Sequence, residues 1–331
     1  MKELVKTLTE TYGPSGDEGQ IRARIIEAIG EAADETRVDA LGNLIVLKRG
    51  RGGGKRVMVA AHMYEIGLVV THVDKKGFAR VGRVGGVQTL TLVGGRVRFA
   101  NGTVGVIGYE KWFKAGAGVP TWDELYVDVG ATSAEDAPVG VGDVAGFTRP
   151  FEDLGNRLVA KSMDDRAGCA VLVEVLRQLA DAPHDVYAVF TTQEEVGTRG
   201  ALVSAFGIEP ELGLAIDVTL TGDVPEARPM AVALGGGPAI KVMDRGVLAH
   251  AGIKRWMMDG AERLGVPYQL EVLEVGGTDA GAIQMSRAGV PAGAVSIPAR
   301  HVHTPSEMVD LNDLQGAVKL LVGLLSAPID L

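Results

Sequence analysis

The sequence predicts an α/β fold, a mixed sheet flanked by helices, with a β-rich domain inserted into it. Strand-like runs alternate with helical patterns at both ends of the chain, which indicates a parallel or mixed sheet covered on both faces. Between about residues 74 and 151 the chain has only short β-like runs separated by Gly, Asn-Gly or Asp turns. We therefore expect residues 1–73 and 152–331 to form the α/β domain and residues 74–151 to form a small barrel.

The first elements follow from local patterns. Ser15, with Glu18 three residues later, resembles a capping box at a helix start. The isoleucines after it recur on one helical face, at Ile21, Ile25, Ile26 and Ile29. The runs "LGNLIVLK" and "KRVMVAA" read as strands, and the second is apolar enough to be buried on both faces.

The second half of the chain returns to the α/β rhythm after the insertion. Strands are predicted at "DVYAVFTT", "LGLAIDV", "YQLEVLEV" and "AGAVSIPAR". Helices are predicted at "RAGCAVLVEVLRQLAD", "RGALVSAFG", "LAHAGIKRWMMDGAERLG" and "DLQGAVKLLVGLLS". The insertion itself offers "FARVGRV", "DELYVDVG" and "VGDVAGF" as short strands, and it contains no amphipathic helix of ordinary length.

Composition excludes several classes of protein. The 331 residues are 46% hydrophobic and carry a formal net charge of −9, and no Lys/Arg-rich run suggests a nucleic-acid partner. The N-terminus has no apolar leader, and no run approaches the ~18 apolar residues that would span a membrane. The single cysteine, Cys169, forbids an intramolecular disulfide and reads as a small core residue. We expect a cytoplasmic protein without nucleic-acid or membrane partners.

Acidic residues and histidines gather where the predicted strands end. Ligands of α/β sheets bind at the carboxyl ends of strands. The residues found there, or at a helix start, are His62, Asp164, Asp165, Glu194, Glu195, Asp217 and His303. Each has an ordinary structural explanation, such as a helix N-terminal charge or a solvated loop. Together they are less well explained in this way, because nearly every predicted strand end carries a histidine or an acidic residue.

The chemistry that needs this set is hydrolysis at a pair of divalent metal ions. Two neighbouring cations require a bridging carboxylate together with further carboxylate or imidazole ligands. A further carboxylate must stay off the metals to accept a proton from the attacking water. Glu194 and Glu195 could divide these roles if a turn, which Gly197 could allow, brings both side chains to the same place.

Eight stretches in series resemble the M42 metallo-aminopeptidases, relatives of which include tetrahedral and glutamyl aminopeptidases and proteins labelled endoglucanase. They are "GPSGDE", "DALGNLIV", "AAHMYEIG", "KSMDDRAG", "TTQEEVGTRGA", "IDVTLTGDVPE", "GGTDAGAI" and "RHVHTPSEMVD". The resemblance implies a phosphorylase/hydrolase-like catalytic domain with an inserted PDZ-like assembly domain. It also implies peptide substrates and a homo-oligomer between a dimer and a dodecamer.

The resemblance further implies a role for each matching residue. Asp164 would bridge two divalent ions, zinc or cobalt foremost and manganese as another option. His62 and Asp217 would complete one site, while Glu195 and His303 would complete the other. Glu194 would be the general base. Asp165 and His301 would be neighbours of ligands, and Asp279 would line the cleft.

Tyr64 departs from the family pattern, which has aspartate at this position. That aspartate would accept the second N–H of the metal-binding histidine, and losing such a partner typically costs ~10–100-fold in metal affinity or activity. Three outcomes are open: an impaired site, replacement of the acceptor by Glu65 or another carboxylate, or an assembling relative without peptidase activity. A related dimetal amidase or deacylase is an alternative function, and carbohydrate hydrolysis would leave the histidines unexplained.

Overall fold

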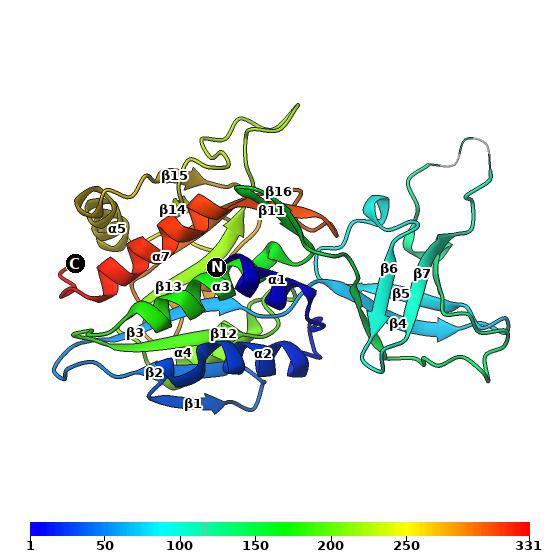
Figure 1. Cartoon of the computed structure of the whole chain (residues 1–331), viewed down its shortest axis with the longest axis horizontal. Coiled ribbons are helices and arrows are strands. Elements are labelled where there is room, and N and C mark those ends of the chain that lie inside the picture. Colours follow the sequence, from blue (N-terminus) through cyan, green and yellow to red (C-terminus); the bar gives the residue numbers. More distant parts are fainter. Residues whose placement is uncertain (115, 117) are drawn as a thin grey trace.

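The computed structural model describes residues 1–114, 116 and 118–331, and it consists of two lobes (Figure 1). The larger lobe is an 11-stranded sheet with helices packed against it, and the smaller is a closed barrel. The helices are α1 (Lys2–Glu10), α2 (Gly19–Ile29), α3 (Met163–Gln178), α4 (Arg199–Ile208), α5 (Ala251–Leu264), α6 (Asp279–Gln284) and α7 (Leu311–Leu325). No helix of the described residues is long and apolar enough to cross a membrane.

The large sheet is mixed, as the sequence predicts. Its strands are β1 (Glu35–Val38), β2 (Leu44–Lys48), β3 (Arg56–His62), β10 (Glu152–Leu154), β11 (Arg157–Ala160), β12 (Asp185–Thr191), β13 (Leu212–Thr219), β14 (Ala239–Met243), β15 (Gln269–Val272), β16 (Ala292–Arg300) and β17 (Glu307–Asp310). The main path runs β1-β2-β12-β3-β13-β16-β17-β11-β10, with β14 paired to β16 and β15. The central strands β12, β3, β13 and β16 are mutually parallel, so their carboxyl ends share one edge.

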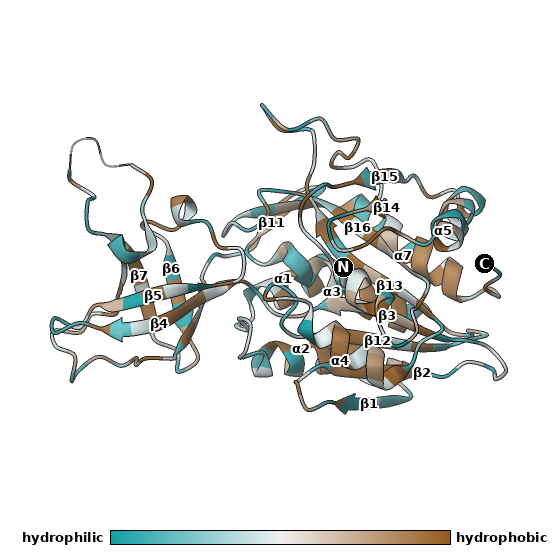
Figure 2. Cartoon of the chain, turned by 180° about the vertical axis from the view of Figure 1, so that it is seen from behind, coloured by the Kyte–Doolittle hydropathy of each residue, from teal (hydrophilic) through white to brown (hydrophobic). Residues whose placement is uncertain are grey.

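Strand β3 is buried on both faces, which explains its continuous apolar sequence. Val57, Val59 and Ala61 belong to the core that includes residues of α2, α3 and α7. Met58 and Ala60 point to the opposite face, where they join residues of α4 and α6. Figure 2 shows the hydrophobic strands enclosed between helices. The arrangement fixes the register of the strand, because a slip of one residue would exchange the two faces.

The inserted β-rich segment is a closed barrel of six antiparallel strands. They are β4 (Gly67–Val73), β5 (Ala79–Val84), β6 (Arg96–Phe99), β7 (Val104–Tyr109), β8 (Leu125–Asp128) and β9 (Val144–Phe147), paired in the order β4-β5-β8-β7-β6-β9. Its apolar core is separate from that of the sheet. The expected boundary at residue 74 is corrected to Gly67, because β4 pairs with β5 and β9 inside the barrel.

One local prediction is wrong at the N-terminus, and another is confirmed in the insertion. The capping box at Ser15 does not form: the N-cap of α2 is Glu18, whose carboxylate accepts the N–H of Gly16, while the N–H of Ser15 donates to the carbonyl of Glu65. In the insertion, the described residues contain only the short 3-10 turns Thr89–Thr91 and Trp122–Glu124, as expected from the lack of helical patterns.

Candidate metal centre

The four parallel central strands bring the predicted site residues to one edge of the sheet. His62 ends β3 and Asp217 lies near the end of β13. Glu194 and Glu195 follow β12, and His303 follows β16. These strands are neighbours in the sheet, so residues far apart in sequence become adjacent in space. Asp164 joins them from the first turn of α3.

Asp164 lies between the two histidines, with one carboxylate oxygen facing each. Its Oδ1 is 2.8 Å from Nε2 of His62, and its Oδ2 is 3.2 Å from Nε2 of His303. Oδ1 of Asp217 is 3.9 Å from the same His62 nitrogen, and Oε1 of Glu195 is 2.9 Å from the same His303 nitrogen. The side chains therefore form two halves joined by a single carboxylate.

A turn after β12 lets the adjacent glutamates share one cavity. The N–H groups of Gly197 and Thr198 both donate to the carbonyl of Glu194 at 2.7 Å. Gly197 has φ +119°, which only glycine adopts readily, so the turn forms where the sequence suggested it. Glu194 and Glu195 both line a cavity of about 490 Å³ together with Asp164, Asp217 and His303.

His303 is held by backbone contacts that the sequence did not reveal. Its N–H donates to Oε1 of Glu307 at 2.7 Å, and the other oxygen of Glu307 accepts the N–H of Asp164 at 2.9 Å. Gly86 of the barrel lies against the ring, where a Cβ would stand 2.3 Å from Nδ1 of His303. The only sequence signal for Glu307 is its place in "RHVHTPSE", four residues after His303.

Burial and crowding of the carboxylates dominate the electrostatics. Burial, reinforced by neighbouring carboxylates, raises the pKa values of Asp217 and Glu194 well above their ordinary range. Burial opposes the charge on His303, but hydrogen bonds to Asp164 and Glu195 outweigh it and raise the pKa of His303 to about 11. Burial and then the charge of Asp164 raise the pKa of Glu307 to about 8. The centre thus holds more negative charge than its histidines offset.

Asp165 orients the site rather than facing the cavity. It lies close enough to His62 and Asp217 to form a geometric triad with them. Its Oδ2, however, accepts the N–H of His62 at 3.2 Å, and its Oδ1 accepts the N–H of Gly168 at 3.0 Å. Because both oxygens already take backbone protons, Asp165 serves to fix the end of β3 against α3.

Tyr64 bridges the two halves of the centre without replacing the aspartate of the family pattern. Its ring is fully buried and stacks on that of His62 with centroids 4.8 Å apart, and its phenolic oxygen accepts the N–H of Glu195. Among the described residues, Nδ1 of His62 has no hydrogen-bond partner. Glu65 does not supply one, because its carboxylate is bound by Lys161 at 2.6 Å and Ser162 at 2.7 Å.

The remaining candidates occupy supporting positions. Asp279 is buried at the start of α6, where its Oδ2 accepts the hydroxyl of Thr191 at 2.5 Å, and its neighbour Thr278 lines the cavity instead. Burial raises the pKa of Asp279 to about 6. His301 is exposed, so His303 is the histidine that faces Asp164. Cys169 is buried, as expected of a core residue.

The side chains fit a pair of divalent cations. Each of the two imidazoles has two carboxylate oxygens within 4 Å, and oxygen and imidazole nitrogen suit zinc, cobalt and manganese. The raised pKa values of Asp217 and Glu194 mean that burial and neighbouring carboxylates disfavour their charged forms. Nearby cations would offset this effect. Each oxygen of Asp164 faces a different imidazole, the placement required of a bridging carboxylate.

Comparison with known proteins agrees with this geometry. A family model described as M42 glutamyl aminopeptidase matches residues 42–320. A putative aminopeptidase of Acetivibrio thermocellus is 48% identical over 324 residues, covering 97% of each chain. The chain therefore belongs to the M42 peptidase family. It is an enzyme of the aminopeptidase class, which hydrolyses N-terminal residues.

Solved structures show the same fold over almost the whole chain. An aminopeptidase from the archaeon Desulfurococcus kamchatkensis superposes with a TM-score of 0.94 at 40% identity, covering 98% of this chain and 94% of that one. The TET1 peptidase of Pyrococcus horikoshii, described as assembling into a tetrahedron or a large octahedral shell, gives a TM-score of 0.89 at 35% identity and covers 98% of each chain. Both lobes are therefore shared with these peptidases.

Proposed function

We propose that the chain is a co-catalytic dimetal aminopeptidase. Asp164 would hold two divalent ions together, with His62 and Asp217 as further ligands of one and Glu195 and His303 as further ligands of the other. The observation that carries this assignment is the position of Asp164, whose two oxygens face separate imidazoles that each have a second carboxylate nearby. Zinc or cobalt is the favoured metal, and manganese also suits these ligands.

When bound, such ions polarise a scissile carbonyl and lower the pKa of an attacking water. The chain supplies the proton transfers. Glu194 lines the same cavity as four of the five proposed ligands but is not needed among them, so it would accept the proton of the water and deliver it to the leaving amine. Burial raises the pKa of Glu194, which makes its carboxylate a stronger base than an exposed one.

The variant Glu194→Gln tests the role of the base. It should lose at least about 100-fold in turnover, because general-base catalysis typically contributes 10²–10⁴-fold, while retaining its metal content by elemental analysis. The exposed Glu135 provides the matched control, Glu135→Gln, which should leave both quantities unchanged. Parent-level activity in Glu194→Gln would show that another group is the base, and loss of metal would make Glu194 a ligand.

The substrate class is tested with amino-acid anilides in the presence of zinc, cobalt or manganese. An aminopeptidase should cleave anilides with a free α-amine and reject those with a blocked amine. The reverse preference would indicate a dimetal deacylase. No cleavage under any of these conditions, with metal bound, would indicate a non-hydrolysing homologue in which Tyr64 has weakened the site.

We also propose that the barrel mediates assembly into a homo-oligomer between a dimer and a dodecamer. Its description as PDZ-like stays a prediction. Exposed aromatic residues support this role, since Trp112 and Phe113 leave 59% and 96% of their surface uncovered in the single chain. Light scattering after size exclusion should give a multiple of the 34.6 kDa chain mass, reduced in Phe113→Ser. A monomeric parent protein would contradict the proposal.

A further inference from the structure

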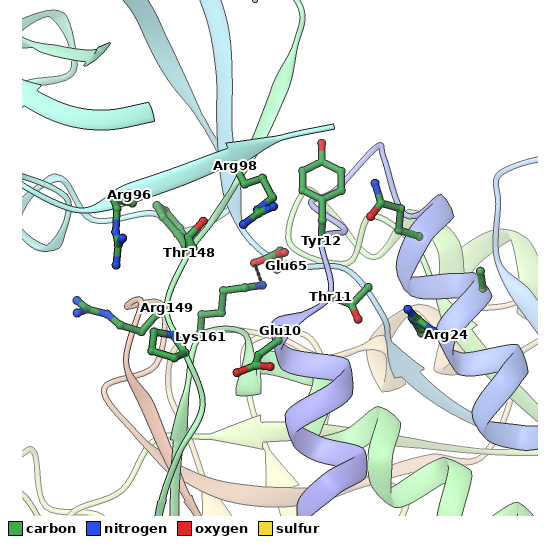
Figure 3. Close-up of a pocket in the computed structure, with 14 residues that line it drawn as sticks. Glu10, Thr11, Tyr12, Arg24, Glu65, Arg96, Arg98, Thr148, Arg149 and Lys161 are labelled. Atoms are coloured by element: carbon green, nitrogen blue, oxygen red, sulfur yellow. Dashed lines mark hydrogen bonds and ion pairs between the residues drawn. The ribbon is translucent and has the colours of Figure 1, made fainter. Parts of the chain in front are cut away.

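A second cavity, of about 880 Å³, lies between the barrel and the sheet lobe. Figure 3 shows Arg96 and Arg98 on the barrel side, Arg24 on the helix side, and Lys161 paired with Glu65 between them. Arg149, from the segment after β9, also lines the cavity. No residue lines both this cavity and the one at the candidate metal centre. The two are therefore separate sites.

The cavity is strongly basic in a chain that is acidic overall. Five lining residues are cationic and two are acidic, whereas the whole chain has a net charge of −9. Both acids already accept hydrogen bonds from other groups. Glu65 accepts from Lys161 and Ser162, and Oε1 of Glu10 accepts the N–H of Phe151 at 3.0 Å. Among the described residues, neither acid forms an ion pair with Arg96, Arg98 or Arg149.

Arg96, Arg98 and Arg149, here called the arginine triad, are the groups without a partner. Within the described part of the chain, none of the three forms an ion pair with a carboxylate. Arg96 and Arg98 are two residues apart on β6, so they point to the same outer face of the barrel. The N–H of Thr148 donates to the carbonyl of Arg96 at 2.9 Å, which brings Arg149 alongside them.

Protection of a sheet edge does not explain these charges. Charged residues commonly shield exposed edge strands from pairing with other chains. Strand β6, however, is paired on both sides, with β7 and with β9, inside a closed barrel. The triad is therefore not explained by edge protection, and its exposed side chains line the mouth of the cavity.

The size and chemistry of the cavity define its ligand. A guanidinium group presents planar, paired donors that match phosphate and carboxylate oxygens. A volume of about 880 Å³ lies in the range of sites that enclose small organic molecules and is far larger than a bare ion needs. Neutral polar side chains of Thr11, Gln20 and Thr148 complete the wall, so hydroxyl groups on the ligand would also find partners.

We propose that this cavity binds a small organic polyanion, with phosphate or carboxylate groups held by the arginine triad. This site is independent of the peptidase reaction, and it would stand even if the proposed roles of Glu194 and the metal ligands were wrong. Phosphate and carboxylate groups would accept the same charge-assisted hydrogen bonds from the triad, and titration with one probe of each kind distinguishes them.

Calorimetric titration of the metal-loaded protein with fructose 1,6-bisphosphate and with tricarballylate tests the proposal. At least one probe should bind saturably with one molecule per chain. Arg98→Gln and Arg96→Gln should each weaken that binding about 10-fold or more, because each removes a charge-assisted hydrogen bond to the anion. The control is Arg83→Gln, because Arg83 is an exposed barrel arginine outside the cavity, and its affinity should stay within about 2-fold of the parent.

Each other outcome overturns the proposal. Absence of binding by both probes removes the site. Equal weakening in Arg83→Gln shows a diffuse charge effect, and binding that survives both triad variants but disappears on metal removal places the anion at the metal centre. If neither probe binds and Arg98→Gln changes the oligomer size by light scattering, the triad is a contact between subunits instead.

Discussion

Tyr64 lies where its two contacts reach both halves of the candidate metal centre. The ring supports His62 by stacking, and the phenolic oxygen receives the N–H of Glu195. It cannot do what a carboxylate would, because Nδ1 of His62 remains without a partner among the described residues. Compared with the aspartate of the family pattern, Tyr64 therefore offers no hydrogen-bond acceptor to Nδ1 of His62. Instead it contacts two proposed ligands, the ring of His62 and the backbone of Glu195.

Restoring the acidic residue tests this interpretation. In Tyr64→Asp we expect metal to bind ~10–100-fold more tightly, because a carboxylate can accept the proton on Nδ1 of His62 and fix its tautomer. Competition against a chromophoric chelator measures the affinity. Tyr64→Phe is the control, since it keeps the stacked ring but offers no acceptor. An affinity in Tyr64→Asp no higher than in Tyr64→Phe would show that the aspartate is not what the site lacks.

The raised pKa of His303 predicts that protons compete with metal. Without metal, Asp164 and Glu195 raise that pKa to about 11, so the imidazole is protonated at neutral pH. Its contribution to the stability of the metal-free protein is complete below about pH 6.5 and is lost as pH rises towards 11. Metal binding must expel this proton, because only the neutral imidazole can be a ligand.

Metal affinity should therefore rise with pH, up to about tenfold per pH unit for each proton displaced. The measurement is chelator competition between pH 6.5 and 8.5. Calorimetry in buffers of different ionisation enthalpy counts the protons released at a fixed pH. An affinity that is constant over this interval would mean that His303 is already neutral before metal arrives, or that it is not a ligand.

At the scale of elements, the parallel strands explain why much of the centre could be predicted. Carboxyl ends of neighbouring parallel strands share an edge, so His62, Asp217 and His303 could be grouped from strand patterns alone. Glu307 could not, because its role rests on two backbone N–H groups that come together only in the folded chain. The hydrogen bond between Tyr64 and the N–H of Glu195 could not be predicted for the same reason.

The loop that follows β5 contacts the candidate metal centre, because its Gly86 lies against the ring of His303. Gly86→Ala should displace His303 and lower metal affinity about tenfold or more, because the added Cβ would stand 2.3 Å from Nδ1. Gly140→Ala is the matched control, since Gly140 also lies in a barrel loop but has open space where an added Cβ would stand. Chelator competition gives the affinities, and circular dichroism checks that both variants fold. Equal affinities would show that the ring can move aside without loss.

At the scale of the whole molecule, the barrel is attached by two adjacent crossings of the chain. Gly67 in β4 is paired with Gly146 in β9, so the segments entering and leaving the barrel are neighbours (Figure 1). The sequence indicated a β-rich insertion but misplaced its start, because composition does not show which lobe a first strand joins. Only the pairing of β4 with β9 and β5 assigns it.

This attachment predicts that the barrel can be removed. Replacing residues 68–145 by Asn-Gly should join Gly67 to Gly146 through a two-residue hairpin turn and leave the sheet lobe folded, since the two lobes have separate cores. Cooperative thermal unfolding followed by circular dichroism is the measurement, and size exclusion should show a smaller assembly than that of the parent. An aggregated or non-cooperative product would mean that the sheet lobe depends on the barrel.

The insertion also sets the order in which the chain can fold as it is synthesised. Strand β3 ends at His62, but its two neighbours, β12 and β13, begin at Asp185 and Leu212. The barrel strands lie between them in one continuous stretch, Gly67–Phe147. At ribosomal speeds β3 waits on the order of ten seconds for a partner, while the barrel is delivered complete. The smaller lobe is therefore the first part of this protein that can be completed, and the catalytic sheet is completed after the barrel beside it.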